Sequence, residues 1–126
     1  MIDYSMAGPL HLVVRAHAIV ESNETPTAIG DGGMAFGILQ IHPGFFHDYY
    51  GRTPEFPASN SDTWIEAEIK AVATYHHVHR FLTSSVDHQH LLVQAYNQGF
   101  AGVFTQGIRA PGYLARWLAA YQKISV

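Results

Sequence analysis

The chain has 126 residues, of which 48% are apolar and 13% are charged, and its formal net charge at pH 7 is −3. A chain of this length can bury about two-thirds of its unfolded surface, and we expect residues 1–126 to form a single domain. The seven Lys and Arg residues form no basic patch for nucleic acid, no apolar run is long enough to span a membrane, and zero Cys excludes disulfides and thiolate metal sites.

The first sixteen residues carry Asp3 and no basic cluster ahead of an apolar run, so we expect no signal peptide here. If the protein works outside the cytoplasm, another route must release it.

The first half of the chain predicts one helix, one hairpin and one loop. Pro9 suits the first turn of a helix that runs to about Ser22. Residues 28–42 combine glycine turns with apolar residues, which favours a small β-hairpin. Residues 43–60 contain several Pro and Gly and are typical of a loop.

The second half predicts three helices. Asp62 is a suitable cap for a helix to roughly Leu82, whose apolar stripe includes Val78 and Leu82. A helix over residues 88–97 would stop at Gly99, a glycine-rich loop would follow, and Pro111 would open the last helix. The pattern indicates an α+β domain that is mostly α, with one small β element.

Glu21 lies at the predicted end of the first helix, beside apolar residues. The negative end of the helix dipole and partial burial would both disfavour the carboxylate and raise its pKa toward the range that a general acid needs. The alternative is a surface glutamate that is free in solvent.

Four stretches in chain order resemble the lysozyme superfamily. Glu21–Asn23, the turn Asp31–Gly33 and Phe36–Ile41 are similar to the active-site stretch of chicken-type lysozymes. Ala95–Gly99 reads Ala-Tyr-Asn-Gln-Gly and resembles the Ala-Tyr-Asn-x-Gly segment of soluble lytic transglycosylases, whose last, weaker motif fits Tyr113. The resemblance implies a lysozyme-like fold with a cleft between the hairpin and the helices.

The resemblance also implies an activity. In that family a glutamate, here Glu21, protonates the glycosidic oxygen between N-acetylmuramic acid and N-acetylglucosamine in peptidoglycan. The expected partner is therefore the peptidoglycan glycan strand, bound by a monomer without metal, organic cofactor, nucleic acid or membrane. A small protein of this kind suits a bacteriophage lysis or virion enzyme that acts on the cell wall.

Supporting roles follow from the same resemblance. Ser22 could orient the acid or the sugar, and Gly37 would let the backbone approach the glycan. Gln40 would support the site by hydrogen bonds. Tyr96 would hydrogen-bond Glu21, and Asn97 would hold a sugar substituent.

Ala35 stands where chicken-type lysozymes have a second carboxylate. Lytic transglycosylases manage with one glutamate, because the 6-hydroxyl of the muramic acid attacks and closes a 1,6-anhydro ring. Asp31 leaves two alternatives open, since it could be the base of an inverting hydrolase or an ordinary turn residue. A third alternative is a module that binds glycan without turnover. Glu24 is expected to be a solvated loop charge.

Nine histidines raise the question of a metal site. His76 and His79 share a helix face, but no carboxylate lies at ligand spacing from them, so we expect histidines at the edge of the core. His17 lies one helical turn before Glu21, where it could touch the site or pack as a partly buried helix residue.

Overall fold

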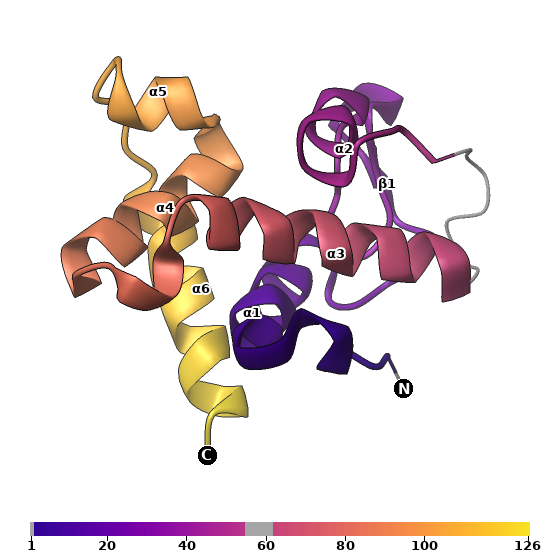
Figure 1. The fold of residues 1–126 in the computed structure, drawn as a ribbon, viewed down its shortest axis with the longest axis horizontal. Coiled ribbons are helices and arrows are strands. Elements are labelled where there is room, and N and C mark those ends of the chain that lie inside the picture. The colour runs from indigo at the N-terminus through magenta and orange to yellow at the C-terminus, as the bar shows by residue number, and fades with distance from the viewer. Residues whose placement is uncertain (1, 55–61) are drawn as a thin grey trace.

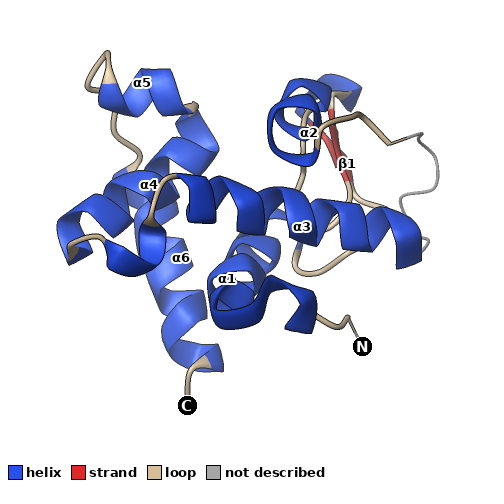
Figure 2. Ribbon diagram, in the orientation of Figure 1, coloured by secondary structure: helices blue, strands red, loops and turns tan. Residues whose placement is uncertain are grey.

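The computed structural model describes residues 2–54 and 62–126, and these residues form a mostly helical fold with one two-stranded antiparallel sheet (Figures 1 and 2). The elements are, in chain order, a 3-10 turn Ser5–Leu10, α1 His11–Ser22, β1 Ile29–Gly30, a 3-10 turn Asp31–Gly33, β2 Ala35–Phe36, α2 Pro43–Tyr50, α3 Asp62–Val78, a 3-10 turn Phe81–Thr83, α4 Val86–Gln98, α5 Phe100–Phe104 and α6 Pro111–Ile124. No helix in the described part of the chain is both long and apolar enough to cross a membrane.

α3 runs through the centre of the molecule, with the hairpin and α2 toward its beginning and α4, α5 and α6 toward its end (Figure 1). α1 packs against α6 and α3, and α2 packs against α3. The fully buried side chains of the core come from α1, the hairpin loop, α2, α3 and α4, and include Val14, Ile38, Leu39, Phe46, Ile69, Val72, Leu92 and Val93.

The hairpin has very few ladder hydrogen bonds of its own. Ile29 pairs with Phe36 and Gly30 pairs with Ala35, and one further bridge joins Phe36 to Ile41. Strands of two residues cannot be stable alone, so the hairpin depends on contacts with the helices.

The predicted hairpin is confirmed, as are the end of the first helix at Ser22 and the start of the last helix at Pro111. Gly99 ends α4 with φ +85°, a backbone conformation that glycine adopts without strain. The predicted capping by the Asp62 side chain lies outside the described residues.

Three predictions of local structure are wrong. Residues 43–50 form α2 and not a loop, because Pro43 occupies the first turn and Gly51 with φ +85° ends the helix. α3 ends at Val78 because Arg80 takes a left-handed conformation, which leaves Val78 57% and Leu82 51% exposed. The loop expected after Gly99 begins with α5.

Candidate active site

Glu21 occupies the last turn of α1 and is half-buried. The helix ends at Asn23, whose φ of +53° is left-handed, and the N–H of Asn23 donates to the Ile19 carbonyl at 3.0 Å. Asparagine tolerates this conformation better than most side chains, so the Glu-Ser-Asn sequence itself sets the end of the helix. The stop fixes Glu21 where the chain turns toward the hairpin.

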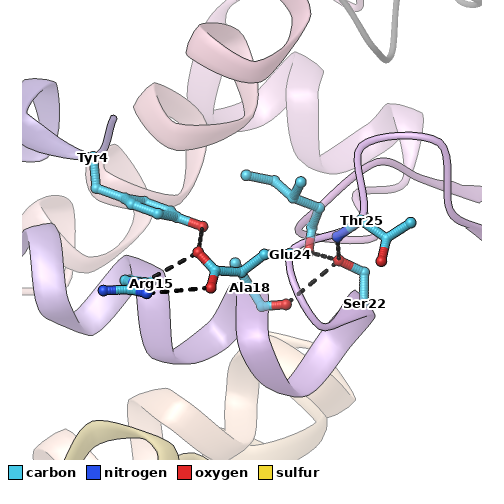
Figure 3. Close-up of polar contacts among 7 residues, drawn as sticks. Tyr4, Arg15, Ala18, Ser22, Glu24 and Thr25 are labelled. Carbon is cyan, nitrogen blue, oxygen red and sulfur yellow. Dashed lines mark hydrogen bonds and ion pairs between the residues drawn. The ribbon is translucent and has the colours of Figure 1, made fainter. Parts of the chain in front are cut away.

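Glu24 anchors the loop that follows Glu21. Its carboxylate accepts a hydrogen bond from the Tyr4 hydroxyl at 2.8 Å and pairs with Arg15 at 3.3 Å (Figure 3). The prediction that Glu24 is a solvated loop charge is therefore wrong. Tyr4, 20 residues before Glu24, and Arg15 of α1, nine residues before it, together hold this loop against α1.

Ser22 also holds the loop, and not the acid. Its hydroxyl donates to the Ile38 carbonyl at 2.7 Å and accepts from the Thr25 N–H at 3.0 Å. Figure 3 shows Ser22 and Thr25 close together beside the end of α1. Of the two roles expected for Ser22, the bond to Glu21 is not formed, since the Ser22 hydroxyl is engaged with backbone groups; the role toward a sugar stays a prediction.

Tyr113 is the side chain that contacts Glu21. Its hydroxyl donates to Oε2 of Glu21 at 2.9 Å, from the first turn of α6. Burial raises the pKa of Glu21 to about 7, while Tyr113 and the Arg116 guanidinium act in the opposite direction. Close to neutral pH the side chain can therefore both give and take a proton, as acid–base catalysis requires.

Tyr96 does not make the hydrogen bond predicted for it. Its hydroxyl donates to the Leu39 carbonyl at 2.7 Å, and its ring packs on His17 with centroids 4.4 Å apart. Tyr96 and Tyr113 approach from different helices, and only the geometry distinguishes which hydroxyl reaches the acid. Tyr96 thus supports the hairpin beside Glu21.

The backbone of Ile38 and Leu39 is held by side chains from three helices. The Ile38 carbonyl accepts from Ser22 of α1, and the Leu39 carbonyl accepts from Tyr96 of α4. Both N–H groups donate to Glu68 of α3, at 3.3 and 3.0 Å. These four bonds replace the ladder that the short strands lack.

Sequence reasoning missed Glu68, which is fully buried and has a pKa raised by burial to about 8. Its carboxylate lies so close to Gly37 that a Cβ atom at that position would clash with it, and Gly37 has φ +81°. In the structure Gly37 makes room for Glu68. Its predicted role toward a glycan stays a prediction.

Gln40 supports the hairpin through its side chain. The amide donates to the Ala28 carbonyl at 3.1 Å and to the Gly37 carbonyl at 2.9 Å, and its backbone has φ +51°. The amide oxygen lies so close to Gly30 that a Cβ atom at that position would clash with it. Gln40 therefore fixes both sides of the turn region.

A pocket of about 540 Å³ brings most of the predicted residues together. It is lined by residues from α1, the hairpin, α2 and the end of α4, namely Glu21, Asp31, Ala35, Gln40, Ile41, His42, Phe45, Tyr96, Asn97 and Gly99. A pocket with one half-buried acid and several polar groups fits a binding site for a polar ligand.

Two features of the pocket bear on a second acid. Ala35 is 3% exposed and contributes only its methyl group. Asp31 has φ +52° and its carboxylate pairs with Nε2 of His42 at 3.0 Å, with 69% of the Asp31 side chain exposed. Asp31 is the second carboxyl that reaches the pocket, and it is solvated where Glu21 is not.

His76 of α3 and His79, which lies in the turn directly after that helix, have different surroundings. His76 is fully buried, with Nε2 2.9 Å from Nε2 of His17, whereas Nε2 of His79 contacts the Tyr49 hydroxyl at 3.0 Å. His76 thus lies in the core and not at its edge. Among the described residues, no group of three or more His, Asp or Glu side chains is placed to hold a metal ion.

Comparison of the chain with family models, with curated proteins and with solved structures gives no match in any of the three. The functional argument therefore rests on the geometry of the pocket and on the motifs that line it.

Proposed function

We propose that the protein cleaves the β-1,4 bond between N-acetylmuramic acid and N-acetylglucosamine in peptidoglycan, with Glu21 as the acid, and that its fold is of the lysozyme type. The observation that carries the proposal is the position of Glu21, which is half-buried in the pocket, has a pKa of about 7 and is held by Tyr113. The substrate class comes from the resemblance of the Glu21 and Tyr96 motifs, both of which line this pocket.

The proposed reaction is that of a lytic transglycosylase. Glu21 gives its proton to the glycosidic oxygen as the bond from C1 of the muramic acid breaks. The 6-hydroxyl of the same sugar then bonds to C1, and its proton returns to the Glu21 carboxylate. The buried methyl group of Ala35 supports this route, because a one-acid mechanism needs no carboxylate at that position.

Hydrolysis is the second candidate, and Asp31 is the observation that favours it. Its carboxylate reaches the same pocket and could activate a water molecule for attack on C1. The pairing with His42 and the high exposure of Asp31 favour instead an ordinary turn residue.

Digestion of purified cell walls in H₂¹⁸O separates the candidates. Transglycosylation releases 1,6-anhydro products that are one water lighter than hydrolytic ends and carry no ¹⁸O, and this is the result we expect. Reducing ends that carry ¹⁸O would favour hydrolysis. Binding of glycan without release of fragments by the folded protein would contradict both and favour a non-catalytic module.

A further inference from the structure

Four side chains form a continuous hydrogen-bonded chain from the pocket into the core. Oε2 of Glu21 contacts the Tyr113 hydroxyl at 2.9 Å, and the same hydroxyl contacts Nδ1 of His17 at 2.8 Å. Nε2 of His17 then contacts Nε2 of His76 at 2.9 Å. His17 and His76 are both fully buried, so this chain is closed to solvent beyond Tyr113.

The charge state of the two rings limits how the chain can be arranged. Burial lowers the pKa of His17 well below its ordinary value and that of His76 to about 3, so near neutral pH each ring is uncharged and carries one N–H. The contact between the two Nε2 atoms therefore needs one ring to donate and the other to accept.

Two arrangements satisfy the three contacts. In the first, His76 donates from Nε2 to His17, His17 donates from Nδ1 to Tyr113, and Tyr113 donates to Glu21. In the second, every bond is reversed and His76 carries its proton on Nδ1. Nδ1 of His76 is buried without a hydrogen-bond partner in the described structure, so the reversed arrangement would bury an unpaired N–H. Buried unpaired donors are rarer than buried unpaired acceptors, which favours the first arrangement.

We propose that His17 and His76 are positioning residues for Glu21: together with Tyr113 they form a chain of donors directed at Oε2, which leaves Oε1 to carry the transferable proton. Within the described residues no donor contacts Oε1 of Glu21. A neutral carboxyl held in this way keeps its proton on the oxygen that has no bond to Tyr113. The role of these residues in turnover rests on the proposed function, whereas the hydrogen-bonded chain of side chains does not depend on it.

Several other titratable or charged groups lie near the members of this hydrogen-bonded chain. Arg116 of α6 favours the charged form of Glu21 and is unchanged by the variants below. The remaining ones are Tyr96 of α4, Glu68 and Tyr75 of α3, and His79 in the turn directly after α3. A variant at position 17 changes the bond to Tyr113 and leaves each of these groups in place.

The first test is the protonation of the rings in the unaltered protein, measured by ¹⁵N NMR of the imidazole nitrogens near pH 7. We expect the proton of His17 on Nδ1 and that of His76 on Nε2. A proton on Nε2 of His17 would overturn the proposal, because Tyr113 would then have to donate to His17 and not to Glu21. This measurement needs neither a variant nor an activity.

The second test is the pKa of Glu21, followed by the ¹³C shift of its carboxyl and assigned with Glu21→Gln. Tyr113→Phe removes the donor itself and should raise the pKa of Glu21 by about one to two units. His17→Phe keeps a ring of similar size but removes the donor to Tyr113, so a smaller rise of about half a unit is expected.

His79→Phe is the matched control, since His79 lies in the turn directly after α3 and also contacts a tyrosine hydroxyl, but is not part of the hydrogen-bonded chain. It should leave the pKa of Glu21 unchanged. If folded His17→Phe behaves like this control, the proposal is overturned. If the pKa of Glu21 rises in His17→Phe but the unaltered protein cleaves no glycan, the proposed function is wrong and the proposal of the hydrogen-bonded chain is supported.

Discussion

Glu21 and Glu68 are both carboxyls withdrawn from water beside the same hairpin, yet their surroundings differ. Burial raises the pKa of Glu21 to about 7 and that of Glu68 to about 8. Glu68 is fully buried, and each of its two oxygens accepts a hydrogen bond from a backbone N–H group. Glu21 lines a pocket, and one of its oxygens accepts a hydrogen bond from Tyr113. A raised pKa alone thus does not identify an acid catalyst. Access to a ligand and an unengaged oxygen distinguish the two.

The largest effect should come from Glu21→Gln. The amide keeps the shape of the side chain but cannot donate the proton, so cleavage of cell walls should fall by on the order of a hundredfold or more. The measurement is turbidity loss of a wall suspension, with circular dichroism to establish that the variant is folded. Turnover near that of the unaltered protein would refute the assignment of Glu21.

The rate of the unaltered protein should depend on pH through the same residue. Because the first step of the proposed reaction needs protonated Glu21, the rate should be level below its pKa of about 7 and fall about tenfold per unit above it. A rate that increases from pH 7 to pH 9 would contradict this role for Glu21.

Glu68→Gln should affect stability and not chemistry. An amide NH₂ facing a backbone N–H leaves donors unpaired, so we expect a loss of about 1–3 kcal/mol in the free energy of unfolding at pH 5. The variant should unfold at lower urea concentration, whereas Glu66→Gln, an exposed change on the same helix, should not.

The pH dependence of this loss has a definite sign. The pKa of Glu68 is raised from 4.5 to about 8 in the folded protein, so its contribution is fully present below pH 4.5 and is lost as the pH rises through 8. The difference between the unaltered protein and Glu68→Gln should therefore shrink as the pH rises and change sign before pH 9, where Glu68→Gln becomes the more stable protein; the total change is on the order of 5 kcal/mol. Parallel stability curves from pH 5 to pH 9 would show that Glu68 does not titrate as the structure implies.

Tyr96→Phe sharpens the contrast between the two tyrosines. Loss of the bond to the Leu39 carbonyl should lower the free energy of unfolding by about 1 kcal/mol. The shape of the rate–pH profile should stay the same, because the hydroxyl of Tyr113 and not that of Tyr96 holds Glu21. A displaced profile would mean that the Tyr96 hydroxyl turns toward the acid when substrate binds.

The smallest effect is expected for Asp31→Asn, which should retain activity within roughly tenfold. Asp31 is a largely exposed turn residue whose contact with His42 is also exposed, and exposed contacts of this kind contribute little. A loss as large as that of Glu21→Gln would instead identify Asp31 as the base of an inverting hydrolase.

Local signals predicted a good part of the fold and the place of the acid. Gly99 marked the end of α4 and Pro111 marked the start of α6. The Glu-Ser-Asn sequence marked the end of α1, with Glu21 in its last turn. The same signals misled at residues 43–50, where Pro43 and Gly51 bound a helix and not a loop. A breaker residue gives a boundary but does not say what lies between two boundaries.

The partners of the acid could not be read from the sequence, because they depend on how helices far apart in the chain pack. Tyr96 and Tyr113 were both candidates, and 92 residues separate Tyr113 from the carboxylate that it contacts. Glu68 did leave a signal, since a glutamate between buried Trp64 and Ile69 lies on the apolar face of α3. An acid at such a position indicates a buried partner, here the backbone of the hairpin.

The four side-chain bonds to Ile38 and Leu39 also have a consequence for how the molecule folds. The donors and acceptors lie 16, 29, 30 and 57 residues away along the chain, so the last of these bonds must wait until α4 has docked. Contacts between residues so far apart in the sequence form late in folding, because closing the long loops between them costs conformational entropy that other contacts must first offset. Amide exchange at Ile38 and Leu39 should therefore require global unfolding, and the pocket should assemble in the final cooperative step of folding.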